Sequence, residues 1–298
     1  MNDFPSVYVI VLTWNQRDLC LETVASVLAS DYPNMRVVVV DNASADGTPD
    51  AVRQSFPDVR LIVNPVNLMY AGGNNVGIDW AMKEGADYVL LLNNDVLVDP
   101  AMVTRLVDAA EAGGAGMAGP MMYYYPPRGE GRELIWYAGG LVSYWMGRTA
   151  HRGIRKVDTG QYRGAEDTYY ISGCALLVHS DVIKDVGLLD TSYVIYSEDA
   201  DWCVRASKAG YRLLFVPEAR LWHKVSASSG GGITPFKVYH RVRSGIKFFA
   251  RHGRPWHWLT MPFFMAGYAV WFLLRKLASG NTGDVWSVIR GLFTPKRG

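Results

Sequence analysis

The chain has 298 residues, of which 49% are hydrophobic and 19% charged, and its formal net charge is +2. This length and varied composition predict one domain of catalytic size with an appendage, and they exclude a disordered or low-complexity protein. The three cysteines, Cys20, Cys174 and Cys203, form no C-x-x-C pair and fall in apolar patterns. We therefore expect buried thiols in a reducing compartment, without a zinc or disulfide framework.

Short apolar runs alternate with helical patterns in the first part of the chain. The first run follows an N-terminus that has an acidic residue and no basic stretch, so it predicts a strand and not a signal peptide, in a chain that begins in the cytoplasm. Expected strands cover residues 6–13, 35–41, 59–63 and 87–93, and expected helices cover 19–28, 71–83 and 101–112. Near-continuous apolarity fits strands covered on both faces, which predicts an α/β fold with a mostly parallel sheet.

Polar side chains follow each of the four expected strands. Any one of them could simply form a turn or a helix cap. Ligands of open parallel sheets bind at the carboxyl ends of the strands, so four polar edges together predict one binding site. These residues are Thr13, Trp14 and Asn15 after the first strand, Asp41, Asn42 and Ser44 after the second, Asn64 and Asn67 after the third, and Asn93, Asn94 and Asp95 after the fourth.

The segment SEDADW, residues 197–202, begins a predicted helix that ends at Gly210 and is followed by a strand over residues 211–216. The helix dipole stabilises acids in the first turn, which accounts for one or two of Glu198, Asp199 and Asp201. A third acid is more than the helix needs. A carboxylate in this position is suited to accept a proton in a reaction, so the excess predicts a catalytic role.

Residues 235–298 contain eleven Lys and Arg against one acid, a net charge of +10. Between residues 237 and 251 basic and apolar residues interleave, which predicts an amphipathic helix on an anionic membrane surface. Residues 258–274 are uncharged, and as a helix they reach about 25 Å, short of a hydrocarbon core of about 30 Å. We expect a helix pair lying in the interface, with a full span as the alternative. The many Phe and Trp favour lipid over nucleic acid.

Five motifs together carry a family resemblance: VIVLTWN, VVVVDNASADGT, NLMYAGGNNVGI, LLLNND and YSEDADWCVRASKAGYRLLFVP. Over residues 6–229 the chain resembles the family-2 inverting glycosyltransferases with the GT-A fold, in particular the rhamnosyltransferase-like branch that builds bacterial surface polysaccharides. The resemblance implies a GT-A catalytic domain over residues 1–232, a Rossmann-like mixed sheet flanked by helices. Its nucleotide-binding half is 1–120 and its acceptor half 121–232, and residues 233–298 form a membrane-associating helical region.

The resemblance implies a site for a nucleotide-diphosphate sugar at the strand ends. Asp41 would accept the ring N3–H of uracil or thymine, although it could also form an Asx-turn toward Ser44. Thr13 and Asn15 would contact the nucleoside, whereas Trp14 could equally be a core residue. The donor-binding residues expected on this basis are Thr13, Trp14, Asn15, Asp41, Asn67, Gly73, Asn74, Asn93 and Asn94.

A metal site is implied at Asn93-Asn94-Asp95, where the family holds Asp-x-Asp or a variant. Asp95 would bind Mg²⁺ or Mn²⁺ that bridges the donor diphosphate, because these hard cations prefer oxygen ligands. A neutral amide stands where the first carboxylate is common, so a second protein ligand is needed. His223 is the candidate, since related enzymes use a histidine after this strand. A histidine at a strand end is otherwise usually structural.

The resemblance assigns the general base to Asp199, with Glu198 as its neighbour or as a group that orients the acceptor. The helix N-terminus is expected to keep Asp199 ionised. Gly173 and Trp202 are expected on the acceptor side, where Gly173 lets substrate approach the backbone, unless it only forms a bulge. Residues 121–167 match no motif and are interpreted as a variable, acceptor-facing insertion.

The predicted function is an inverting, metal-assisted transfer of a sugar to a lipid-linked glycan during bacterial polysaccharide or lipopolysaccharide synthesis. The expected donor is dTDP-rhamnose, with a UDP-sugar open because thymine and uracil share the edge that Asp41 would contact. The expected location is the cytoplasmic face of the inner membrane, peripheral or monotopic. Two alternatives remain: a galactofuranosyl- or polyprenyl-phosphate-type transferase, and a non-catalytic membrane-tethered module that binds sugar nucleotides.

Overall fold

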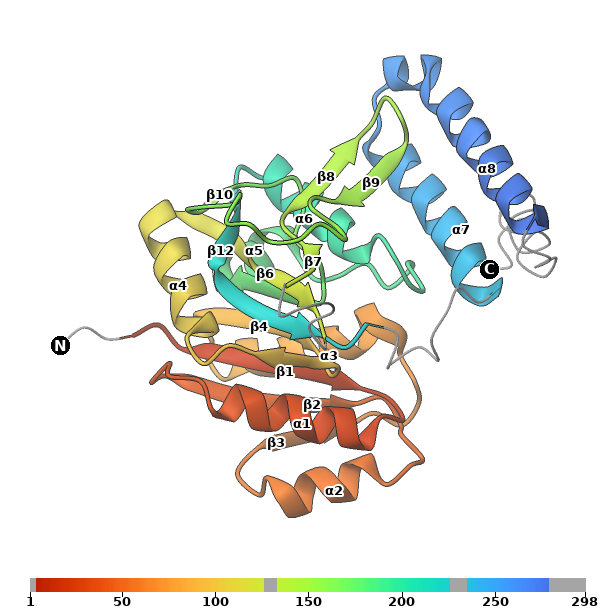
Figure 1. The fold of residues 1–298 in the computed structure, drawn as a ribbon. Helices are drawn as coiled ribbons and strands as arrows, with labels where there is room; N and C mark the ends of the chain where they lie inside the picture. The colour runs from red at the N-terminus through yellow and green to blue at the C-terminus, as the bar shows by residue number, and fades with distance from the viewer. Residues whose placement is uncertain (1–3, 126–132, 226–234, 279–298) are drawn as a thin grey trace.

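A computed structural model describes residues 4–125, 133–225 and 235–278, which form a mixed sheet flanked by helices (Figure 1). The strands are β1 (Val7–Thr13), β2 (Met35–Asp41), β3 (Arg60–Val63), β4 (Tyr88–Asn93), β5 (Val96–Val98), β6 (Ala115–Tyr124), β7 (Ile135–Tyr137), β8 (Gly140–Ser143), β9 (Arg148–His151), β10 (Glu166–Asp167), β11 (Ala175–His179) and β12 (Arg212–His223). The helices are α1 (Arg17–Leu28), α2 (Thr48–Ser55), α3 (Met69–Lys83), α4 (Met102–Gly113), α5 (Ser180–Val186), α6 (Glu198–Lys208), α7 (Pro235–His252), the 3-10 helix η1 (Pro255–Leu259) and α8 (Met261–Ala278).

The main sheet has the strand order β10-β12-β6-β11-β4-β1-β2-β3. Strands β1 to β4 are mutually parallel, as the alternation of apolar runs and helical patterns predicted. Thr13 at the end of β1 lies opposite Asp41 of β2, and Leu12 lies opposite Asn93 of β4. The polar residues that end these strands therefore meet at one edge of the sheet.

The second half of the domain adds antiparallel strands to the sheet, and one of its strands is longer than the sequence predicted. β11 runs antiparallel between β4 and β6, and β12 runs parallel to β6. The strand expected over residues 211–216 continues to His223, because the pairing with β6 is interrupted between Val216 and Arg220 and then resumes. Pro217, which has no N–H to donate, lies within that irregularity. The described part of the 121–167 insertion supplies β7 to the sheet and the β8–β9 hairpin beside it.

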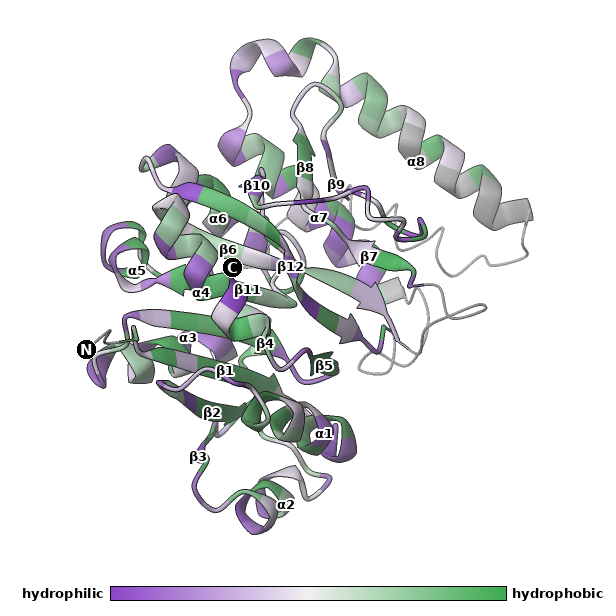
Figure 2. Cartoon of the chain, turned by 60° about the vertical axis from the view of Figure 1, so that its left-hand side comes forward, coloured by the Kyte–Doolittle hydropathy of each residue, from purple (hydrophilic) through white to green (hydrophobic). Residues whose placement is uncertain are grey.

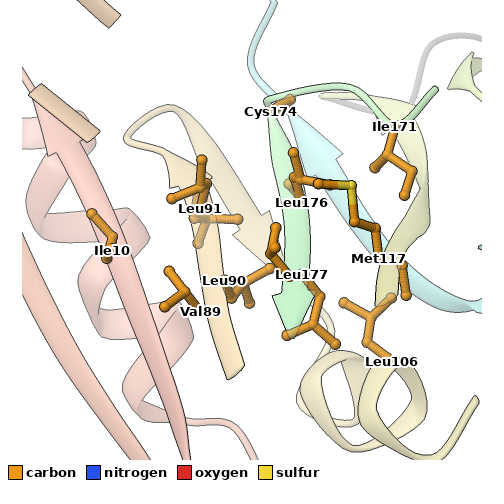
Figure 3. Close-up of a cluster of buried hydrophobic side chains, with 14 of the residues drawn as sticks. Ile10, Val89, Leu90, Leu91, Leu106, Met117, Ile171, Cys174, Leu176 and Leu177 are labelled. Carbon is orange, nitrogen blue, oxygen red and sulfur yellow. The ribbon is translucent and has the colours of Figure 1, made fainter. Parts of the chain in front are cut away.

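The core lies between the sheet and its covering helices. Figure 3 shows side chains of β1, β4, β11 and β6 meeting across the sheet, with Leu106 of α4 below them. Their near-continuous apolarity reflects burial on both faces, which the sequence predicted. The three cysteines are buried and free, as expected. Representative core residues are Ile10, Leu90, Leu91, Met117, Leu176 and Leu177.

Helix α7 packs against the catalytic core instead of standing apart from it. Its side chains Phe248 and Phe249 are 0% and 3% exposed and belong to the main apolar cluster. Lys247 and Arg251, two of the basic residues expected to face a membrane, reach Asp190 with N–O distances of 3.2 and 2.8 Å. At these positions the amphipathic pattern therefore reflects docking onto the protein.

The expected boundary between residues 232 and 233, and residues 279–298 of the basic tail, lie outside the described residues. Within the ranges that are described, no helix combines the length and apolarity that a membrane crossing requires.

We expect Phe248→Ala to lower the free energy of unfolding by about 3–5 kcal/mol, because it removes a fully buried ring between α7 and the core. Phe236→Ala on the same helix is the control, since Phe236 is 51% exposed and its loss should cost no more than about 0.5 kcal/mol. Urea unfolding of both variants measures the difference. Equal losses would mean that α7 does not contribute to the stability of the catalytic domain.

Candidate active site

Side-chain hydrogen bonds tie the ends of β1, β2 and β4 together. Asn94 Nδ2 donates to Thr13 Oγ1 over 2.8 Å, and both side chains are buried. Asn15 accepts from the backbone N–H of Ala45 at 2.7 Å, and its own N–H donates to Ser44 Oγ at 2.8 Å. Two of the expected donor-binding residues, Thr13 and Asn15, therefore also fix the loops that border the site.

Asp41 is fully buried at the end of β2 and is satisfied on only one side. Its Oδ1 accepts from the N–H of Ser44 at 2.8 Å, which is the Asx-turn considered above. Oδ2 is buried and has no hydrogen-bond partner among the described residues. A buried acceptor without a partner costs about 1–3 kcal/mol, so this oxygen is suited to a ligand N–H. The Asx-turn leaves Oδ2 available to a base N–H, but Asp41 is 0% exposed in this conformation, so the loops that border it must move before a nucleotide reaches it.

The remaining donor-side residues divide into exposed and packed ones. Trp14 is 52% exposed, which excludes the core alternative. Asn67 accepts from the N–H of Met69 at 2.8 Å and so caps the loop before α3. A Cβ on Gly73 would lie 2.5 Å from Leu12, and Asn74 is 1% exposed. Gly73 and Asn74 hence pack α3 closely against the sheet. In this conformation they expose little surface that could contact the nucleotide sugar.

Asp95 and His223, the predicted metal ligands, are brought together by pairing between β5 and the end of β12. His223 lies opposite Val96 in this antiparallel register, and the N–H of Lys224 donates to the carbonyl of Asp95 at 2.8 Å. His223 Nε2 lies 3.1 Å from Asp95 Oδ1, and both side chains are buried. Trp136 of β7 packs edge to face on the His223 ring at 4.5 Å between centroids.

Asp95 offers an oxygen and His223 a nitrogen that a divalent cation accepts as ligands, provided that the imidazole is deprotonated. Burial by itself lowers the pKa of His223, but the neighbouring Cys174 and the Asp95 carboxylate outweigh it and raise the pKa to about 10. This pKa puts a proton on His223 at neutral pH, and the 3.1 Å between Nε2 and Asp95 Oδ1 is the distance of a hydrogen-bonded pair, so a cation held by these two residues would have to displace that proton. Within the described ranges no cluster of three or more His, Cys, Asp or Glu forms, so a bound cation would need oxygens from the donor diphosphate.

Asp199 and Glu198 form a coupled acid pair at the start of α6. Asp199 Oδ2 accepts from the N–H of Gly173 at 2.9 Å and Oδ1 from the N–H of Ala200 at 2.7 Å. Glu198 is 6% exposed, and its Oε2 has no hydrogen-bond partner among the described residues. The two carboxyls therefore differ in their surroundings, because the amides of Gly173 and Ala200 hold Asp199, whereas the backbone hydrogen bond of Glu198 lies within its own residue.

Burial and mutual repulsion control the protonation of the pair. Burial raises the pKa of Glu198 to about 8, with the charge of Asp199 adding to the shift. Burial also raises the pKa of Asp199, while its backbone hydrogen bonds to Gly173 and Ala200 act against the shift. Desolvation thus outweighs these donors at Asp199, and the expectation that Asp199 is ionised at neutral pH stays a prediction. Both carboxyls are therefore harder to ionise than isolated ones, and the two titrate as a coupled pair.

Strained backbone borders the same edge of the sheet. Tyr196 and Ser197, the two residues before α6, have φ angles of 71° and 69°, and Asn15 and Ala43 after β1 and β2 have φ of 51° and 62°. Non-glycine residues in this region cost of order 1–3 kcal/mol each and persist only where their surroundings fix them. Such positions concentrate at functional sites, which supports the strand ends and the start of α6 as one site.

Tyr70 of α3 is a site residue that the sequence analysis missed. Its hydroxyl donates to the carbonyl of Gly173 at 2.5 Å. A Cβ added to Gly173 would lie 2.5 Å from the hydroxyl oxygen of Tyr70. Gly173 precedes β11 and so is not a bulge within a strand. Its lack of a side chain admits Tyr70, which links the donor half to the residue that holds Asp199. The signal was present in NLMYAGG, but nothing local indicated the partner.

Trp202 is a correction to the expected acceptor site. It is 0% exposed, and its Nε1–H donates to the carbonyl of Gly187 at 2.7 Å, so it packs in the core and cannot contact a substrate in this conformation. The third acid of the helix is also structural. Asp201 is buried and lies 2.8 Å from Arg205 and 2.8 Å from His252 of α7.

Polar residues at the carboxyl ends of parallel strands, together with a buried acid pair that Gly173 links to α3, are compatible with a group transferase. The profile of glycosyl transferase family 2 matches residues 8–187, more than half of the chain. The chain therefore belongs to glycosyl transferase family 2 and is a glycosyltransferase of its rhamnosyltransferase branch.

Two curated relatives cover most of the chain. The N-acetylglucosaminyl-diphospho-decaprenol L-rhamnosyltransferase of Mycobacterium tuberculosis is 31% identical over 250 residues, which are 77% of this chain and 79% of that protein. The dTDP-rhamnosyl transferase RfbF of Shigella flexneri is 23% identical over 258 residues, which are 81% of this chain and 79% of that protein.

Solved structures agree in fold. The mannosyltransferase PcManGT from Pyrobaculum calidifontis, in complex with GDP-Man and Mn²⁺, has a TM-score of 0.62 at 18% identity and covers 99% of this chain and 89% of its own. GalNAc-T7 with UDP, GalNAc and Mn²⁺ has a TM-score of 0.62 at 15% identity, over 83% of this chain and 48% of its own. The GT-A-like mixed sheet flanked by helices is thus the fold of this chain.

We expect Glu198→Gln to change how stability depends on pH. In the folded protein Glu198 keeps its proton up to about pH 8, whereas the unfolded chain releases it near 4.5, so this group makes folding weaken as pH rises between these values. The variant should lose that part of the decline. Urea unfolding across this pH range tests it, with the surface variant Glu84→Gln as control. A slope unchanged in Glu198→Gln would contradict the raised pKa.

Proposed function

We propose that the protein transfers L-rhamnose, with inversion, from a thymidine or uridine diphosphate carrier to a lipid-linked glycan acceptor. The single observation that carries the catalytic part is the acid pair, in which the Gly173 and Ala200 amides orient Asp199 and the buried Glu198 precedes it in the chain. The two rhamnosyltransferase relatives support the sugar, and the name of the mycobacterial one supports a lipid-diphosphate acceptor.

In this proposal Asp199 is the general base of a single displacement. The acceptor hydroxyl oxygen bonds to the anomeric carbon, its proton passes to Asp199, and the bond from that carbon to the nucleoside diphosphate breaks on the opposite face. Burial raises the pKa of Glu198, so in this proposal Glu198 holds the proton of the coupled pair and leaves Asp199 to accept the one from the acceptor hydroxyl. The fixed amides of Gly173 and Ala200 orient Asp199 before substrate arrives, which lowers the entropic cost of the step.

On the donor side, Asp41 Oδ2 accepts the base N3–H, and Thr13 and Asn15 flank the nucleoside. Asp95 and His223 would hold a divalent cation, whose contribution when bound is to neutralise charge on the diphosphate. The Mn²⁺ in the two structural neighbours supports a metal of this kind. The rival transferases of the same fold use other sugars or acceptors, and a panel of dTDP- and UDP-sugars against lipid-phosphate and lipid-glycan acceptors separates them.

We expect Asp199→Asn to lower turnover by about two or more orders of magnitude, because general base catalysis contributes about 10²–10⁴-fold. Donor affinity should change little, since the amide retains an oxygen for the Gly173 N–H. Asp185→Asn, a carboxylate outside the site, is the control. Rate and nucleotide binding are measured separately. A variant that keeps a tenth or more of the wild-type rate would mean that another residue is the base. Turnover by the wild-type protein would by itself reject the alternative of a non-catalytic binding module.

Asp95→Ala should abolish metal-dependent donor binding, and His223→Ala should weaken it, because the pair supplies the protein ligands of the cation. Binding of dTDP is titrated with and without Mn²⁺ in each variant, and binding of Mn²⁺ itself is followed by its paramagnetic effect on water relaxation. Undiminished activity of the wild type in excess EDTA would reject the metal and leave Asn93, Asn94 and Asp95 as a polar cradle for the nucleotide.

We further propose that the protein works at the cytoplasmic face of the inner membrane, where a lipid-linked acceptor is present. The exposed apolar residues of η1 and α8 support this location. Trp256, Leu259, Phe263 and Phe264 are each 47–77% exposed. This surface is separate from the inner face of α7, which docks on the catalytic core.

A further inference from the structure

A basic hollow lies at the junction of α6, the β8–β9 hairpin and the segment after α7. Its volume is about 290 Å³, and no acidic residue lines it. Two exposed cations, Lys208 and Arg254, enter it, and the guanidinium of Arg254 lies over the ring of Trp256 at 5.2 Å. The lining residues are Tyr144, Lys208, His252, Arg254, Trp256 and His257.

A buried relay fixes the ammonium of Lys208 in this hollow. Lys208 Nζ lies 3.1 Å from His252 Nδ1, and His252 Nε2 lies 2.8 Å from Asp201 Oδ1. An ammonium can only donate, so Nδ1 must accept and Nε2 must carry the proton that is donated to Asp201. Asp201 therefore holds the imidazole, and the imidazole holds Lys208. The cation is positioned in advance, as in a site built for an anion.

Exposed apolar side chains of the segments next to the hollow form what we call the apolar rim, and one of them, Trp145, packs edge to face on the lining residue His257 at 5.1 Å between centroids. Trp258, Leu259 and Phe263 are 44%, 71% and 77% exposed, and Trp145 at the hairpin tip is 50% exposed. The hydroxyl of Thr260 donates to the carbonyl of Trp145 at 2.8 Å, which fastens the hairpin to the start of α8. Figure 2 shows that α8 carries apolar residues away from the sheet, and in Figure 1 α7 lies between it and the body of the domain.

We propose that the basic hollow binds the phosphodiester headgroup of an anionic phospholipid while the apolar rim enters the bilayer interface. Fixed cations beside exposed Trp and Phe match the charge and polarity of that boundary. The diphosphate of the acceptor is a poorer occupant, because Lys208 lies about 14 Å along α6 from Asp199, farther than one sugar residue extends. This inference rests on the proposed membrane location, and it names anionic phospholipid as the membrane component that the protein would bind there.

The test is lipid binding alone, without donor or acceptor, so its outcome is independent of the transferase activity. Cosedimentation is measured with phosphatidylcholine vesicles that contain or lack phosphatidylglycerol. The double variant Lys208→Gln, Arg254→Gln should bind the anionic vesicles roughly 30-fold more weakly, since each basic residue near such a surface contributes about fivefold. Lys83→Gln, Arg53→Gln removes two cations elsewhere and is the matched control. Equal losses in the two double variants would overturn the site.

Calorimetric titration with short-chain phosphatidylglycerol and with inorganic phosphate distinguishes the two sources of the anion. Binding of the soluble lipid that is lost in Lys208→Gln, Arg254→Gln and kept in the control supports the proposal, whereas inorganic phosphate bound equally well would overturn the lipid assignment. Leu259→Glu, Phe263→Glu changes the rim alone and should lower vesicle binding without affecting the soluble headgroup. Circular dichroism of each variant shows that it is folded. If the wild-type protein binds neither short-chain phosphatidylglycerol nor inorganic phosphate, the proposed site is wrong.

Discussion

The site depends on one constraint, the in-register parallel pairing of β1 with β2 and β4. This pairing sets Thr13 opposite Asp41 and Leu12 opposite Asn93, so polar residues from distant parts of the chain end at one edge. A slip of one residue would turn every side chain of a strand to the opposite face, and the buried faces forbid it. The core that holds the register therefore also holds the donor site.

The acid pair illustrates how function opposes local stability. Glu198 is buried with an oxygen that lacks a hydrogen-bond partner among the described residues, and Tyr196 and Ser197 before it adopt left-handed backbone angles. Each feature is unfavourable by itself, and each persists because α6 is anchored on both sides. Tyr70 and Gly173 hold its N-terminal acids, while Asp201 is held by Arg205 and His252.

Helix α7 gives the basic C-terminal region two different tasks. Its inner face completes the core through Phe248, and Lys247 and Arg251 neutralise Asp190, whose pKa is lowered well below its usual range by the hydrogen bonds of Ser192 and Lys247 against the effect of burial. The residues after α7 carry the exposed aromatic surface. A single count of positive charge over 235–298 could not separate these tasks.

The sequence by itself determined the strand and helix order, the mostly parallel sheet and the family, because hydrophobic period and terminal polar residues are local signals. It also placed Asp41, Asp95, Asp199 and His223 at strand or helix ends. The tertiary structure decided what no local signal encodes: that Trp202 and Asn74 are buried, that Tyr70 reaches Gly173, and that His223 meets Asp95. It also decided that burial raises the pKa of Asp199, because desolvation depends on neighbours that only the folded chain brings together.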